Sequence, residues 1–129
     1  MHEDEILDLL DLMLESVGLI EMRFSRIRLP GDFVLSSDGV TLLDSVSMRL
    51  QVIGESVRRI QKLDPSFFSR CPSIDWDKLA RFRDLVSHHY TQIDHEIIFD
   101  ICKVHIPQLK DALKKIRSNI PAAEGSASS

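Results

Sequence analysis

An arginine, a pair of histidines and a tyrosine fall within the eight residues 83–90 of the chain. Arg83 and His88 are five residues apart, so on an ideal helix their side chains lie about 140° apart, close enough to flank one cleft. Histidine exchanges protons near neutral pH, and the charged, planar guanidinium of arginine fits phosphate oxygens. Such a pair has the chemistry to cleave RNA without a metal: the imidazole moves the proton of the 2′-hydroxyl or of the leaving oxygen, and the guanidinium stabilises the charge developing at phosphorus.

Long amphipathic helices precede this segment, because apolar residues recur there at spacings of three and four. One helix is expected from Glu3 to about Arg28, where a Leu-Pro-Gly sequence at 29–31 ends it. After a loop at 36–39, a second helix carries a similar apolar stripe from Leu43 to Ile60. Narrow stripes of this length are typical of helices that pack nearly parallel in a bundle.

The second half of the chain is expected to be helical as well, with more interruptions. Two prolines within 64–72 predict an irregular crossover. A helix capped by Ser73 or Asp75 should then run to about residue 89. A last helix should begin at Thr91 or Asp94 and reach about residue 119, with Pro107 either kinking it or dividing it in two.

Composition places the chain among ordinary folded proteins. Its 129 residues are 43% hydrophobic and 28% charged, which suits one domain, expected over residues 1–120, followed by a flexible tail at 121–129. No apolar run approaches the roughly 18 to 20 residues that cross a bilayer, and the first residues are acidic. We therefore expect a cytoplasmic protein without a membrane partner.

Sites for metals or disulfides are not indicated by the sequence. Cys71 and Cys102 lack the spacing of a zinc site and are expected to be reduced thiols with packing roles. His95 and His105 are ten residues apart without a recognisable ligand pattern, so neither a metal nor another cofactor is expected.

Charge is spread unevenly along the chain, whose net charge is −4. Acidic residues gather near the start and basic residues near the end, in part as expected from the dipoles of the first and last helices. A negative protein contacts RNA only through a local basic patch. Arg49, close to the apolar stripe of the second helix, is a possible RNA contact in that patch.

The spacing Arg83-x4-His88-x-Tyr90 resembles the R-x4-H-x-Y signature of HepT-like proteins in the HEPN superfamily, the toxin halves of bacterial and archaeal toxin–antitoxin pairs. Four further segments resemble that family, and the likeness extends over about residues 3–117. These segments are residues 53–56, 71–76, 93–94 and 106–110. The chain departs from the common pattern at Thr91, where an aromatic residue is frequent.

The resemblance implies an all-α, HEPN-type up-and-down bundle of four to five helices that forms a homodimer. It also implies a ribonuclease acting on mRNA or tRNA, with Arg83 and His88 of two chains meeting in a cleft at the interface. Asp84, which follows the motif arginine, could orient Arg83 or His88. Tyr90 resembles the tyrosine to which a partner antitoxin, a minimal nucleotidyltransferase of the MntA type, transfers AMP.

Other readings of the same residues stay open at this point. The aromatic residues of the crossover and of the motif helix, Phe67, Phe68, Trp76 and Phe82, are expected to pack in the core rather than to stack on bases. A single tyrosine near a helix end is usually a partly buried packing residue. The alternative function is a non-catalytic HEPN protein that serves as partner and substrate of the nucleotidyltransferase.

Overall fold

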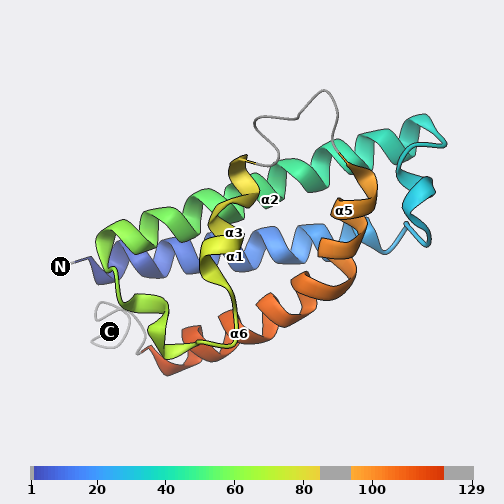
Figure 1. Ribbon diagram of the computed structural model, residues 1–129. Coiled ribbons are helices and arrows are strands. Elements are labelled where there is room, and N and C mark those ends of the chain that lie inside the picture. The colour runs from blue at the N-terminus through green and yellow to red at the C-terminus, as the bar shows by residue number, and fades with distance from the viewer. Residues whose placement is uncertain (1, 85–93, 121–129) are drawn as a thin grey trace.

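A computed structural model describes residues 2–84 and 94–120, and every regular element in those ranges is helical (Figure 1). Two long helices, α1 (Glu3–Phe24) and α2 (Ser37–Leu63), pack side by side with opposite directions. The last helix, α6 (Ile106–Asn119), packs against α1 along its other side. The all-α bundle predicted from the apolar spacing is therefore confirmed.

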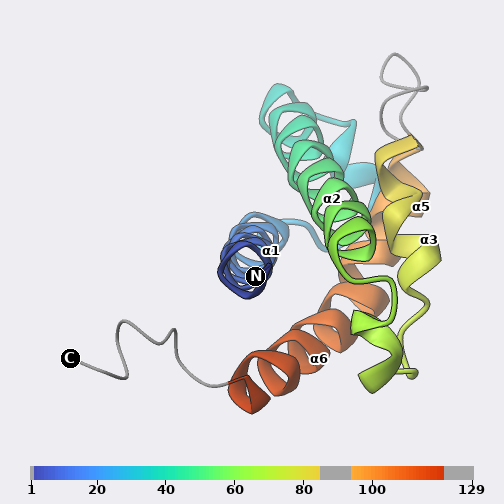
Figure 2. The same cartoon turned by 90° about the vertical axis from the view of Figure 1, so that its left-hand side faces the viewer.

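Shorter helices cover one side of this bundle. The helix α3 (Trp76–Ala80) packs on α2 and crosses the long helices instead of running along them. The helix α5 (His95–Asp100) contacts α2 and the 3₁₀ turn η1 (Pro30–Phe33) that links the two long helices. Viewed end-on, α3 and α5 lie on the side of α2 that faces away from α1 (Figure 2).

Ion pairs join α1 to both of its neighbours along the bundle. The charge asymmetry of the sequence is therefore not only a matter of helix dipoles, because acids of α1 meet bases of α2 and α6. Exposed pairs of this kind contribute roughly 0–1 kcal/mol each, so they add little to the stability of the bundle. The pairs are Glu5–Arg59 at 2.8 Å, Glu21–Lys110 at 2.9 Å and Asp11–Arg117 at 3.0 Å.

The first helix ends at Phe24, four residues before the predicted end near Arg28. The proline at position 30 explains part of the difference, because a residue before proline avoids helical dihedrals, and Leu29 is extended with φ −129° and ψ 153°. The next helix begins at a good cap. The hydroxyl of Ser36 accepts the backbone N–H of Gly39 at 2.9 Å.

The crossover between α2 and α3 is held by aromatic packing. It contains one 3₁₀ turn, η2 (Phe67–Arg70), and the Phe68 ring stacks on Trp76 with centroids 4.0 Å apart. The Trp76 indole N–H donates to the carbonyl of Cys71 at 2.8 Å. All four aromatic residues expected to pack in the core are buried, so that prediction is confirmed.

The helix that carries Arg83 is interrupted, which differs from the continuous helix predicted to residue 89. The helix α3 ends at Ala80, and the chain turns at Arg81 before residues 82–84 become helical again. The Arg81 N–H is shared between the carbonyls of Asp77 and Lys78, at 3.2 and 3.1 Å. This bifurcated bond tightens the last turn of α3.

Pro107 is accommodated by a change of helix type. The aspartate expected as a possible cap, Asp94, accepts the N–H groups of Glu96 and Ile97 and starts α5. A π-helical turn, η4 (Ile101–His105), then leads into α6, in which Pro107 occupies the first turn. A proline is tolerated there because those N–H groups need no partner within the helix. Residues 95–119 stay helical throughout and bend between α5 and α6 (Figure 1), so of the two alternatives at Pro107 the structure shows the kink.

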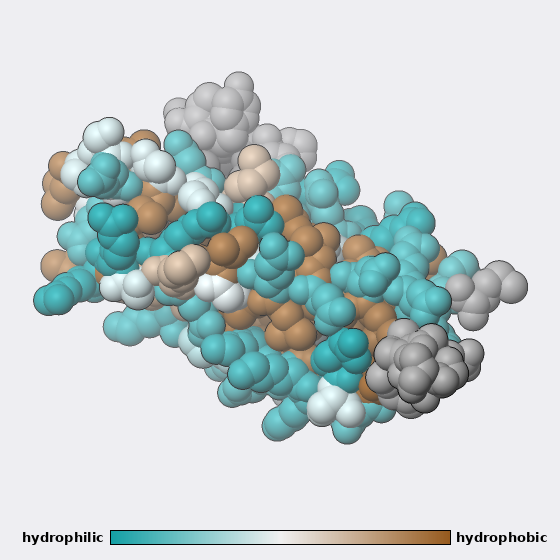
Figure 3. All heavy atoms as spheres, turned by 180° about the vertical axis from the view of Figure 1, so that it is seen from behind, coloured by the Kyte–Doolittle hydropathy of each residue, from teal (hydrophilic) through white to brown (hydrophobic). Residues whose placement is uncertain are grey.

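The face opposite α3 is partly apolar. Figure 3 shows hydrophobic residues along the middle of this face, with hydrophilic residues on both sides. None of the helices in the described ranges combines the length and apolar character needed to cross a membrane.

Both cysteines are free thiols, as expected, and their burial differs. Cys102 is buried, and its burial raises the pKa of the thiol to about 12, whereas Cys71 is half-buried. Because the thiolate is the reactive form, iodoacetamide at pH 8 should alkylate Cys71 in the native protein and leave Cys102 unmodified. Mass spectrometry of peptides, with denatured protein as the control that labels both, checks this. Fast native labelling of Cys102 would contradict the packing.

Candidate active site

Two contacts fix the segment that carries Arg83, one at each end of α3. At the start, the Asp75 carboxylate caps the helix by accepting the N–H of Lys78 at 3.0 Å. The neighbouring indole is anchored on the crossover through its bond to Cys71. The cap was one of the two alternatives that the sequence offered, and the structure selects the aspartate.

At the other end, the backbone of α2 touches the backbone that leads into Arg83. A Cβ atom added to Gly54 would lie 2.9 Å from the backbone nitrogen of Arg83 and 3.0 Å from the carbonyl oxygen of Leu79. It would also lie 3.2 Å from the carbonyl oxygen of Ala80. Only a residue without a side chain permits this approach. Gly54 therefore acts as a positioning residue for Arg83.

This role of Gly54 was missed by the sequence reasoning, which noted the residue only as part of a family-like segment. A signal was present in the sequence. A glycine inside an otherwise regular helical pattern costs about 1 kcal/mol relative to alanine, so it often marks a close approach of backbones. The sequence does not say which segment approaches.

The side chain of Arg83 is accessible. It is 45% exposed and forms an ion pair with Asp84, whose oxygen Oδ1 lies 3.7 Å from the arginine Nε. At this distance the contact is electrostatic and not a hydrogen bond. The Asp84 carboxylate thus lies beside the guanidinium, and its role in orienting Arg83 stays an expectation.

Of the remaining predicted site residues, the structure describes only Arg49. His88 and Tyr90 lie outside the described residues. Arg49 is half-buried on α2. It precedes Gly54 by five residues, which places it about 7.5 Å away along the helix axis and about 140° around it. The structure brings Arg83 and Asp84 together and leaves the role of Arg49 an expectation.

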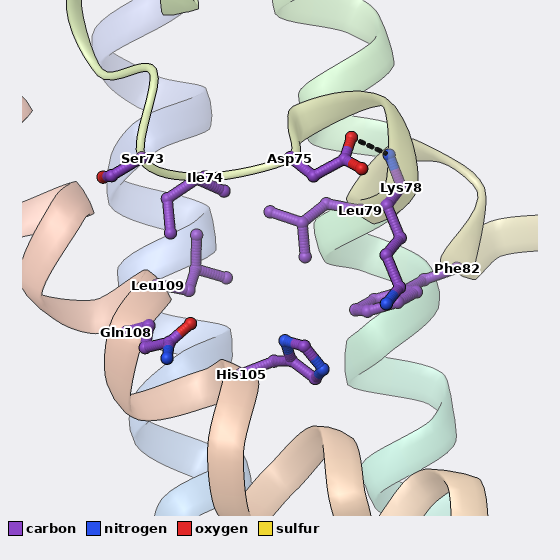
Figure 4. A pocket seen from close by; sticks show the side chains of 9 residues that line it. All are labelled: Ser73, Ile74, Asp75, Lys78, Leu79, Phe82, His105, Gln108 and Leu109. Atoms are coloured by element: carbon purple, nitrogen blue, oxygen red, sulfur yellow. Dashed lines mark hydrogen bonds between the residues drawn. The ribbon is translucent and has the colours of Figure 1, made fainter.

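A cavity of about 220 Å³ lies beside the segment that carries Arg83. It is found between the start of α3 and the junction of η4 with α6 (Figure 4). Its lining includes Phe82, the residue directly before Arg83, and His105 from the π-helical turn. The His105 Nε2 is 3.8 Å from an oxygen of Asp100. In the described part of the chain, no three histidine, cysteine or acidic side chains gather as metal ligands would.

Comparison with known sequences places these residues in a family. The profile of the family described as "Ribonuclease HepT-like" matches residues 13–116, a span that includes the whole segment 83–90. The protein "Probable ribonuclease HepT" of Thermococcus cleftensis is 34% identical over 111 residues, which are 85% of this chain and 94% of that protein.

Two proteins of Methanocaldococcus jannaschii are also similar. "Gamma-glutamylcyclotransferase and putative RNase MJ0434" is 30% identical over 111 residues, covering 86% of this chain and 47% of that protein. "Putative RNase MJ0127" is 36% identical over 81 residues, covering 63% of this chain and 62% of that protein. The chain thus spans about half to three-fifths of the length of these two relatives. No solved structure matches the chain significantly.

Proposed function

Because the chain belongs to the HepT-like ribonuclease family, we propose that it is a metal-independent endoribonuclease that acts on mRNA or tRNA as the toxin of a toxin–antitoxin pair. The observation that carries the proposal is the position of Arg83: its side chain is half-exposed, while its backbone is held against Gly54. A cation held in this way suits the binding of a phosphate group whose charge changes during reaction.

The chemistry follows from the two motif side chains. The imidazole of His88 takes the proton of the 2′-hydroxyl, or gives one to the departing 5′-oxygen, as the 2′-oxygen attacks the adjacent phosphorus. Arg83 stabilises the additional negative charge on the phosphorus oxygens. The bond from phosphorus to the 5′-oxygen breaks, leaving a 2′,3′-cyclic phosphate on one product and a 5′-hydroxyl on the other. No metal is needed for any of these transfers.

A homodimer belongs to the same proposal. One chain supplies a single Arg83 and a single His88, and a cleft between two copies would supply two of each to one RNA strand. The net charge of −4 makes this concentration of cations useful, because the protein as a whole repels RNA.

The proposal is tested by incubating the purified chain with RNA in excess EDTA. Cleavage that persists without divalent ions supports a metal-independent ribonuclease. An intact substrate after incubation, together with stable binding of a nucleotidyltransferase, would favour the alternative of a non-catalytic partner and substrate protein.

We expect the partner antitoxin to be an MntA-type nucleotidyltransferase that transfers AMP from ATP to Tyr90. The phosphate would add negative charge and bulk within the motif, two residues after His88, and so oppose RNA binding. When the chain is co-expressed with a nucleotidyltransferase encoded beside it, intact-mass analysis should find added AMP groups on the parent and none on the Tyr90→Phe variant. Tyr90 is the only tyrosine, so the comparison is direct. If both the parent and the Tyr90→Phe variant carry AMP, the modified residue is not Tyr90.

A further inference from the structure

The cavity beside α3 offers a binding site next to the candidate active site. On the premise of the proposed ribonuclease function, we propose that it holds one unstacked nucleobase of the RNA substrate. It is lined on one side by Ile74 and Leu79 and on the other by Gln108 and Leu109 (Figure 4). A base is the part of RNA that needs apolar walls and polar edge groups together.

The size of the cavity fits a single base. Its volume is about 220 Å³, whereas a cavity of about 150 Å³ holds benzene and pockets for drug-sized molecules begin at about 300 Å³. One heterocycle of one or two rings therefore fits.

The polar groups in the lining are those that recognise base edges. The Gln108 amide offers a donor and an acceptor side by side, the arrangement that binds adenine in two hydrogen bonds. The Asp75 carboxylate uses Oδ1 to cap α3, which leaves its second oxygen able to accept from an amino group of a base. Lys78 and His105 add further polar atoms around the same space.

The position of the cavity relates it to Arg83. Phe82 lines the cavity and is followed directly by Arg83, and successive Cα atoms are only about 3.8 Å apart. The backbone of Arg83 therefore starts at the edge of the cavity, and the proposal assigns its half-exposed guanidinium to the phosphate of the nucleotide whose base enters the cavity. The segment from Asp75 to Arg83 would then contact both the base and the phosphate, and Gly54 keeps the end of that segment in place.

The adenine of an AMP group attached to a protein has the same chemistry as a base of RNA. The following experiment distinguishes these two sources of the base. The unmodified full-length chain is titrated with AMP, GMP, CMP, UMP and ribose 5-phosphate, and binding is measured by isothermal titration calorimetry; in the parent, NMR at the Gln108 side-chain amide shows whether the ligand enters the cavity. At least one nucleotide should bind more tightly than ribose 5-phosphate. A short RNA containing that base should displace the nucleotide, and the same RNA with an abasic site should not.

Variants at the cavity give the matched comparison. Gln108→Ala should weaken binding about 5- to 150-fold, the range expected from loss of a paired amide contact. Asp75→Asn, which keeps the helix cap, should change the order of preference among the four bases. Gln51→Ala, on α2 and away from the cavity lining, should leave binding unchanged. Thermal unfolding of each variant checks that the fold is intact.

Several outcomes would overturn the inference. Equal binding of ribose 5-phosphate and the nucleotides, or unchanged binding by Gln108→Ala, would show that no base occupies the cavity. If AMP binds and no RNA displaces it, the cavity holds the base of an AMP group and not a base of RNA. Mononucleotide binding can be measured without any cleavage. A protein that binds a base and does not cleave RNA would therefore refute the proposed nuclease activity but not the base-binding site.

Discussion

Replacing His88 with alanine is expected to lower the rate of RNA cleavage by about 100- to 10,000-fold, the usual contribution of a general acid or base. Arg83→Ala should lower it by about 100- to 1,000-fold, because a preorganised charge at the phosphate is lost. Arg83→Lys should fall between the parent and the alanine variant, since it keeps the charge without the planar fork. Rates are measured on purified protein with one RNA in EDTA.

Two neighbouring residues provide controls for these variants. Arg81→Ala removes an exposed arginine two residues from Arg83, and His95→Ala removes a histidine at the start of α5. Both should retain cleavage within a few-fold of the parent. In cells that lack the antitoxin, His88→Ala should also relieve growth arrest. A variant that remains as toxic and as active as the parent would remove His88 from the mechanism.

Gly54→Ala is expected to destabilise the protein by about 1–3 kcal/mol, the usual cost of forcing extra volume into a packed contact. The added carbon would meet backbone atoms of Leu79, Ala80 and Arg83, which cannot rotate away as a side chain can. Helix α2 must therefore move away from α3 and the segment that follows it. Because the backbone of Arg83 moves with them, cleavage should fall even at temperatures where the variant is folded.

Gly18→Ala is the matched control, because a Cβ at that position in α1 would have no atom within 4 Å. This variant should gain up to about 1 kcal/mol from better helix propensity and cleave RNA at the parent rate. Thermal unfolding resolves the difference, since 1 kcal/mol corresponds to roughly 4 °C in a chain of this length. Equal stability and equal activity of the two alanine variants would show that the α2 contact does not position Arg83.

Much of the helical framework could be predicted because it follows from local sequence. Apolar spacing defined the two long helices, the paired prolines marked the crossover, and Asp75 and Asp94 were among the expected caps. The end of α1 was predicted four residues too late, because apolar periodicity continues past Phe24 into the turn that contains Ile27. Periodicity reports which residues are buried and says less about whether they are helical.

The features that position the candidate site depend on tertiary packing, which a single sequence does not display. Gly54 was visible as a glycine in a helix, but its contact with the backbone of Arg83 exists only once α3 crosses α2. The pairing of Asp11 with Arg117 likewise joins residues from opposite ends of the chain. The break at Arg81 could not be read from a regular apolar pattern either.

Analysis of the ends of the cleavage products tests the central claim most directly. The chain is incubated with a defined RNA in EDTA, and the products are examined by mass spectrometry beside the same RNA carrying a 2′-deoxy nucleotide at the cleaved position. We predict 2′,3′-cyclic phosphate and 5′-hydroxyl ends, with no cleavage of the 2′-deoxy substrate, because the 2′-oxygen is the nucleophile. Products with 5′-phosphate and 3′-hydroxyl ends, formed only when a divalent metal is added, would contradict the assignment of Arg83 and His88.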